Sequence, residues 1–263
     1  GPMLDAGFVR QYPTATGNAI PWPTIDYTAK VGELKSENSA ATDDGGNDIV
    51  FGQKVLNAYL YDSEVVKVSI ELLQDSAFSM DALLSECFGE SLGRTVNNVL
   101  TVGDGSSKPN GIVTASAAGK TAASATAITS DEIIDLLHSV DPAYRASPNC
   151  RWMFNDSTFA AIRKLKDGQG NYLWQMGDVR SGAPGTLLGS PYAINQAMAS
   201  IATGNKTVLF GDMSRYVVRR AGPMQMLSLR ERYMDALQVG FISFMRVDGE
   251  LLNTAAVKHL VQA

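Results

Sequence analysis

Hydrophobic positions recur every three or four residues along one long stretch, residues 79–102, which places them on one face of a helix. Ser79 suits the N-cap, and Gly103 suits the position just beyond the last turn. At a rise of 1.5 Å per residue the helix would be roughly 35 Å long, enough to run the length of a domain. Because Gly89 and Gly93 lie inside it, we expect a bend or a closely packed neighbour there. The apolar positions are Met80, Leu83, Leu84, Cys87, Leu92, Val96, Val99 and Leu100.

Two strand-like stretches, TIDYTAKVGEL and DIVFGQKVLNAYLY, flank the polar segment KSENSAATDDGGND. A polar, glycine-bearing segment between two strands is typical of a hairpin tip. One face of these strands carries few apolar residues, so we expect the hairpin, residues 25–66, to project from the body and to find its packing partner elsewhere. Before it, Pro13, Pro21 and Pro23 argue against a regular ladder, and we expect residues 1–24 to form an extended arm.

The rest of the pattern mixes shorter helices and strands. TSDEIIDLLHSV starts a helix with a capping box, Thr129 and Glu132, and should end before Pro142. Strands are predicted in CRWMF, KTVLFGD, RYVVRRA and several stretches after Met224, and a capped helix followed by a turn in NDSTFAAIRKLKDGQGNYLW. The Ala/Ser/Thr-rich residues 114–128 are interpreted as a connector. The predicted fold class is α+β.

Composition supports an ordinary globular chain. Its 263 residues are 45% hydrophobic and 19% charged, which is enough apolar material for a sizeable core. The net charge of −5 does not indicate a nucleic-acid-binding surface, and no apolar run approaches the ~18 residues of a membrane span. Cys87 and Cys150 lack metal or redox spacing, so we expect buried free thiols in a reducing compartment.

The segment VGDGSSKPNGIV, residues 102–113, raises the question of phosphate binding, because three glycines surround two serines and a lysine. A phosphate-binding loop leads from a strand into a helix, whose N–H groups attract the anion. Here the loop follows the end of the predicted helix, where carbonyl groups would repel phosphate. We therefore interpret the glycines as geometric, with a left-handed cap at Gly103 and turns at residues 104–105 and 109–111.

Two further segments imitate nucleotide motifs. TASAAGKT, residues 114–121, has Thr114 where a Walker A motif requires glycine, and no amphipathic helix follows Lys120. VLFGD imitates a Walker B strand that ends at Asp212. A nucleotide-binding enzyme is therefore only a remote alternative.

Other candidate residues have simpler interpretations. His138 and His259 lack the spacing of a zinc protease and have no GxSxG elbow nearby, so we interpret both as structural or surface residues. DDGGND, residues 43–48, does not match a calcium loop and fits a solvated hairpin tip. One basic concentration could face phosphates or the carboxylates of a partner subunit, and it comprises Arg215, Arg219, Arg220, Arg230 and Arg232. We predict no catalytic, cofactor-binding or metal-ligating residue, and no enzyme.

One stretch, VSIELLQDSAFSMDALLSECFGESLGRTVNNVLTVGDGSSKPNGIV, resembles the signature of tailed-phage major capsid proteins, whose shell fold was first described for phage Hong Kong 97. In that family a "vS.ell.Ds" segment enters a long spine helix that ends in "l.GdG...P.Gi". The resemblance continues in family order through WMFNDSTFAAIRKLKDGQGNYLW, LLGSPYAI, VLFGDMSRYVV and RVDGELLNTAAVKHL. It spans about residues 20–260.

This resemblance implies a Hong Kong 97-like capsid fold. The hairpin, residues 25–66, would be the extended E-loop, and residues 67–111 and 225–263 would form the peripheral domain with its spine helix. Residues 112–224 would form the axial domain. Residues 1–24 would be a residual N-terminal arm, and the initial GPM looks like a protease-cleavage scar.

The implied function is that of a non-enzymatic structural subunit of an icosahedral shell around phage double-stranded DNA. It would reside in the virion and, during assembly, in the host cytoplasm. Its implied partners are copies of itself in hexamers and pentamers, the neighbouring subunit through the E-loop, and packaged DNA without sequence specificity. Scaffold, portal or decoration proteins and a bacterial immune sensor are further candidates, whereas no membrane partner and no cofactor is implied.

The sequence also departs from part of the family pattern. Some members cross-link their shells through a Lys–Asn isopeptide bond assisted by a Glu. Residues 36–48 contain no lysine, and residues 236–246 contain neither Asn nor Glu, so we expect no cross-link. With only a stub of the arm, we expect the chain to stay as monomers or single capsomers. An encapsulin-like compartment that packages protein cargo shares the fold and is the alternative function.

Overall fold

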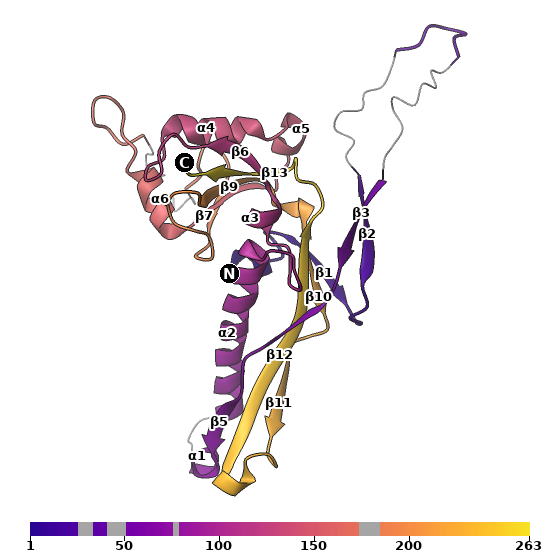
Figure 1. Ribbon diagram of the computed structural model, residues 1–263, viewed down its shortest axis with the longest axis vertical. Coiled ribbons are helices and arrows are strands. Elements are labelled where there is room, and N and C mark those ends of the chain that lie inside the picture. Colours follow the sequence, from indigo (N-terminus) through magenta and orange to yellow (C-terminus); the bar gives the residue numbers. More distant parts are fainter. Residues whose placement is uncertain (26–33, 41–50, 76–78, 174–184) are drawn as a thin grey trace.

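The computed structural model describes residues 1–25, 34–40, 51–75, 79–173 and 185–263. These ranges contain both helices and strands, and the strands form a six-stranded sheet, a five-stranded sheet and a separate two-stranded hairpin (Figure 1). The predicted α+β class is confirmed. None of the helices in these ranges combines the length and the apolar character that a membrane span needs.

The long helix α2 (Met80–Val102) has the predicted bounds and runs alongside the six-stranded sheet (Figure 1). Its buried positions are Phe88, Leu92, Val96, Asn97, Leu100 and Thr101. Two predicted core positions in its first half, Leu83 and Cys87, are instead exposed. A short helix, α1 (Ile70–Asp75), precedes α2 at the far end of the sheet.

The six-stranded sheet is organised around one long strand, β12 (Gln238–Leu251), which has different partners along its length. Side chains of β12 alternate between two faces, and Val247 and Leu251 join the core beside α2. The antiparallel partners of β12 are β10 (Tyr216–Ala221), β11 (Gln225–Leu229), β4 (Tyr59–Asp62) and β5 (Val66–Ser69). A further strand, β1 (Arg10–Thr14), pairs in parallel with β10.

The second sheet has the strand order β6-β13-β9-β7-β8. Its strands are β6 (Ala117–Thr121), β13 (Val257–Val261), β9 (Lys206–Asp212), β7 (Cys150–Phe154) and β8 (Tyr192–Ile194). The surrounding helices are α3 (Ile112–Ala115), α4 (Ser130–Ser139), α5 (Pro142–Arg145) and α6 (Asp156–Arg163). The short 3₁₀ turns are η1 (Pro2–Leu4), η2 (Met213–Arg215) and η3 (Met234–Ala236).

The predicted capping box at the start of α4 is confirmed. The backbone N–H of Thr129 donates to Glu132 Oε2 at 2.8 Å, and the N–H of Glu132 donates to Thr129 Oγ1 at 3.3 Å. These two bonds satisfy N–H groups that the first turn of a helix leaves without partners.

One continuous hydrophobic core joins the two sheets. Leu92, Val96 and Leu100 of α2 belong to the same cluster as Trp152 of β7 and Phe210 of β9. A smaller cluster lies nearer the start of α2 and contains Val68, Phe88, Val239 and Phe241. Helix α2 is therefore fixed to the body mainly through its second half.

The N-terminal residues do not form the predicted extended arm. Met3 in η1 is fully buried, and its N–H donates to Asn97 Oδ1 of α2 at 3.2 Å. Pro13 lies within β1, and Pro21 and Pro23 lie within β2 (Ile20–Ile25). Proline is tolerated at these places because β1 ends its sheet and β2 belongs to a two-stranded sheet, so each strand has a free edge.

The hairpin and the connector also differ from prediction. β2 pairs with β3 (Phe51–Leu56), so the hairpin begins at residue 20, whereas residues 59–69 contain two strands of the six-stranded sheet. The predicted connector contains β6, which pairs with β13. Small residues fit there because a Cβ on Gly119 would collide with Leu136 and Lys258.

Sheet membership departs from the predicted division of the chain at two segments. The predicted axial domain, residues 112–224, includes β10, yet β10 pairs with β12 of the six-stranded sheet. The predicted peripheral domain, residues 67–111 and 225–263, includes β13, yet β13 pairs with β6 and β9 of the five-stranded sheet. The reason in both cases is long-range strand pairing, which local sequence patterns do not report.

Candidate assembly surface

The hairpin formed by β2 and β3 exposes an apolar face. The register pairs Ile25 with Phe51 and Pro21 with Val55, which places these four side chains on the same side of the ribbon. Ile25 is 47% exposed, Phe51 66% and Val55 46%. The opposite face, which includes Trp22 and the fully buried Leu56, is more covered. Because the hairpin projects from the body (Figure 1), its apolar face has the character of an interaction surface.

The glycine-rich loop after α2 is a tightly packed connection. Gly103 has φ −55°, so the predicted left-handed cap is wrong. Glycine is required there because a Cβ would overlap the carbonyl oxygens of Pro109 and Val99. The positive φ angles belong to Gly105, at 75°, and Ser107, at 55°. The loop leads from the end of one helix into α3 by close backbone contact.

Neither nucleotide-like segment has the shape of a phosphate site. Residues 114–121 form the end of α3 and the strand β6, and Lys120 Nζ lies 2.6 Å from Asp135 Oδ2. Asp212 is buried and caps η2. Its Oδ1 accepts hydrogen bonds from the backbone N–H of Ser214 at 3.0 Å and from the Ser214 hydroxyl at 2.6 Å. The ammonium group of Lys120 is therefore engaged in a local ion pair, and the carboxylate of Asp212 in a helix cap.

His259 is a buried structural residue. Its Nδ1 lies 2.8 Å from Ser116 Oγ, whose hydroxyl donates to the carbonyl of Val113 at 2.9 Å. Because that hydroxyl proton is used, the geometry assigns the bridging proton to the histidine Nδ1. Burial, with a smaller effect of Lys206 and Lys258, lowers the pKa of His259 to about 4. The side chain is therefore neutral at physiological pH.

The other candidate residues form no centre. His138 Nδ1 lies 2.7 Å from Arg145 Nη1 on an exposed surface. Cys150 is buried as expected, and burial raises the pKa of its thiol to about 11, but Cys87 is exposed, contrary to prediction. The DDGGND segment lies outside the described residues, and within the described ranges no three His, Cys, Asp or Glu side chains gather into a metal site.

The five arginines of the predicted basic concentration are dispersed. Arg219 is fully buried beneath the hairpin, whereas Arg220, next to it in β10, is exposed. Arg215 Nε lies 3.6 Å from Asp212 Oδ2. Arg230 and Arg232 follow β11 near the opposite end of the sheet (Figure 1). The sequence does not predict the burial of Arg219, because Tyr216, Val217 and Val218 before it are consecutive apolar residues and show no alternation.

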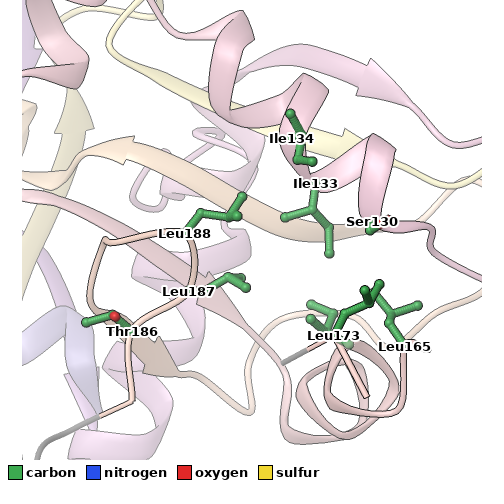
Figure 2. Close-up of a pocket in the computed structure, with 9 residues that line it drawn as sticks. Ser130, Ile133, Ile134, Leu165, Leu173, Thr186, Leu187 and Leu188 are labelled. Atoms are coloured by element: carbon green, nitrogen blue, oxygen red, sulfur yellow. The ribbon is translucent and has the colours of Figure 1, made fainter. Parts of the chain in front are cut away.

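An apolar pocket of about 150 Å³ lies between α4 and the segments around α6 (Figure 2). Ile133 of α4 and Leu187 project toward each other across it, and Leu165 and Leu173 approach from a third side. Its lining is almost entirely aliphatic, so it offers little polar chemistry for catalysis.

Comparisons with known proteins agree with this architecture. Over residues 1–262 the chain matches the phage capsid family. A solved structure titled capsid of the native GTA particle is 23% identical, with a TM-score of 0.81, and the match covers 97% of this chain and 88% of that one. The solved structure titled Mycobacterium phage Adephagia is 14% identical, with a TM-score of 0.72, and the match covers 100% of this chain and 90% of that one. The solved structure titled Microbacterium phage Oxtober96 is 16% identical, with a TM-score of 0.71, and the match covers 97% of this chain and 90% of that one. No curated protein sequence matches.

The spine helix, the projecting hairpin and the two sheets define a capsid shell fold, and the solved structures share that fold. The chain belongs to the phage capsid family. It is a major capsid protein, a structural component of the virion.

Proposed function

We propose that this chain builds an icosahedral shell of hexamers and pentamers around phage double-stranded DNA, with each hairpin packed on the neighbouring subunit. The observation that carries the proposal is the exposed apolar face of β2 and β3, led by Phe51 at 66% exposure. Among the described residues, the body of the same chain lies against the opposite face, so we expect the partner of the apolar face to come from another molecule. Burying a side chain such as Phe51 stabilises a contact by roughly 1.5–3 kcal/mol, and a closed shell repeats that contact in every subunit.

We further propose how the two sheets divide the work. The peripheral domain consists of the spine helix and the six-stranded sheet, including β10, and the axial domain consists of the five-stranded sheet, including β13. This division revises the predicted boundaries and follows the observed strand pairing.

The proposed shell has no enzymatic activity. This view is supported by the structural use of each candidate group, as Asp212 caps a turn and Lys120 pairs with Asp135. The subunit would contact packaged DNA only weakly and without sequence readout, because its net charge of −5 does not favour binding to phosphates. Assembly would take place in the host cytoplasm before the shell is filled.

The test compares two substitutions on the same face of β3. Phe51→Ser removes the main apolar contact, and Gln53→Ser, two residues away, is the matched control. We expect Phe51→Ser to lower the yield of shells at least tenfold by electron microscopy and sedimentation, while leaving the unfolding midpoint of the isolated chain unchanged. A normal shell yield with Phe51→Ser would contradict the proposed contact.

A further inference from the structure

Both arms of the hairpin meet the body at one buried arginine. Arg219 donates from Nε to Thr14 Oγ1 at 3.1 Å and from Nη2 to the Thr16 carbonyl at 2.8 Å, where the chain leads into β2. Its Nη1 donates to the carbonyls of Leu56 at 2.8 Å and Asn57 at 3.0 Å, where the chain leaves β3. A single planar guanidinium therefore joins the incoming and the outgoing arm.

The residues beside Arg219 extend this polar contact across the sheet. Tyr12 of β1, Arg219 of β10 and Asp248 of β12 are register partners, so their side chains form a row on one face. Asp248 is buried and its Oδ2 accepts a hydrogen bond from the N–H of Asn57. Two positions along β12, on the same face, Glu250 Oε1 accepts from Lys54 Nζ at 3.0 Å.

The apolar side chains at the hairpin root lie outside the two hydrophobic clusters of the body. Leu56 is fully buried, yet it belongs to neither of the two hydrophobic clusters. Trp22 meets Tyr12 edge to face, with ring centroids 5.0 Å apart. Apolar contacts of this kind allow sliding and rotation, whereas hydrogen bonds have preferred directions. The polar contacts are therefore the ones that can define an angle.

We propose that Arg219, Asp248 and Glu250 form a lock that fixes the direction in which the hairpin leaves the body before a neighbouring subunit is met. The guanidinium fork suits this role because its donors point in several fixed directions within one plane. A lysine at position 219 would keep the charge but could not reach both arms in the same geometry. Release is unfavourable because it would leave a buried guanidinium without acceptors.

The lock has a consequence for assembly that rests on the proposed function. When the hairpin is held in one direction, Ile25, Phe51 and Val55 are already oriented when a neighbouring subunit arrives. Preorganisation of this kind reduces the entropy lost when two subunits associate. A freely pivoting hairpin would make the same contacts more slowly and less often.

The lock can be tested on the isolated chain by measuring distances between two spin labels. The labels replace exposed Gln53 on the hairpin and exposed Thr95 on α2, with Cys87 changed to Ser. We expect Arg219→Lys to widen the distance distribution at least twofold. The matched control, Arg220→Lys on the neighbouring exposed residue, should leave it unchanged. An unaltered distribution in folded Arg219→Lys would overturn the lock.

A second variant keeps the test decisive if Arg219→Lys does not fold. The double substitution Lys54→Met with Glu250→Gln removes the partly exposed ion pair and leaves the buried arginine in place. We expect a smaller but clear widening, and an unchanged distribution would then overturn the proposal. The distance measurement needs no shell, so a wild-type chain that never assembles would contradict the proposed function without deciding the lock.

Discussion

Two glycines illustrate how local contacts decide the effect of adding one methyl group. A Cβ at Gly103 would overlap the carbonyl oxygens of Pro109 and Val99, whereas a Cβ at Gly89 in α2 would meet nothing within 4 Å. We expect Gly103→Ala to lower the free energy of unfolding by about 2 kcal/mol. Gly89→Ala should raise it by about 0.5–1 kcal/mol because alanine favours the helix.

Urea unfolding measures both glycine substitutions under the same conditions. The predicted effects have opposite signs, so each variant serves as the control for the other. Equal stability of Gly103→Ala and the wild type would show that the loop relaxes around the methyl group, against the close packing described.

His259 makes stability depend on pH in a defined window. Its pKa is about 4 in the folded chain and 6.5 ordinarily, so between these values the unfolded chain binds a proton that the folded chain does not. The free energy of unfolding should therefore fall as the pH drops from about 6.5 to about 4. After allowance for partial solvent screening, the loss is about 2 kcal/mol.

The variant His259→Gln isolates this contribution. Asp248, whose pKa is raised by burial, gives a slope of the opposite sign, so the comparison is made as a difference between wild type and variant. The difference should change across the window for His259→Gln and stay constant above it, where the histidine is neutral in both the folded and the unfolded chain. If the free energy of unfolding of His259→Gln depended on pH as it does in the wild type, the attribution of this pH dependence to His259 would be contradicted.

At this scale, sequence alone predicts chemistry better than burial. The structural interpretation of His259 followed from motif spacing, and the geometric role of the glycines in residues 102–113 followed from the helix before the loop. The buried lock at Arg219 did not, because its acceptors are backbone carbonyls more than 160 positions away in the chain. The misassigned Gly103 shows that glycine alone does not distinguish a positive φ from close packing.

At the scale of elements, the hairpin is the segment whose environment should change most on assembly. Leu34 is 98% exposed and Phe51 66% exposed in the isolated subunit. We expect amide hydrogens in residues 34–40 to exchange quickly in the isolated chain and markedly more slowly in shells. Hydrogen exchange with mass spectrometry measures both states, and β7 in the core provides the unchanged reference.

Equal protection of residues 34–40 in both states would argue that the hairpin does not pack on a neighbour. The reference strand matters for this comparison. If protection of β7 also rose on assembly, the change would reflect global stabilisation rather than docking of the hairpin.

Elements with a strong local signal were predicted closely. The helix α2 follows from its periodicity, and α4 from its capping box. By contrast, β1 and β6 are strands because a neighbouring backbone pairs with them, despite Pro13 in one and a run of small residues in the other. Free sheet edges and close packing decide such cases, and neither is visible in a single segment.

At the scale of the whole molecule, ordered motifs carried more information than periodicity. Five motifs in family order identified the capsid fold, and the family match over residues 1–262 confirms it. The crossing of the chain between its sheets, with β10 on one and β13 on the other, was not predicted. The alternation of polar and apolar residues in a strand does not identify the strand that pairs with it. The sheet to which β10 or β13 belongs therefore follows only from long-range pairing.

The central claim is that subunits form a closed shell in which each hairpin lies on its neighbour. Electron cryomicroscopy of particles made by this chain, expressed together with its neighbouring genes, tests that claim most directly. We expect closed icosahedral particles with Ile25, Phe51 and Val55 buried against an adjacent subunit, and with Arg219 still bonded to both arms of its own hairpin. Particles in which the hairpin folds back onto its own body, or in which its apolar face remains in solvent, would contradict it.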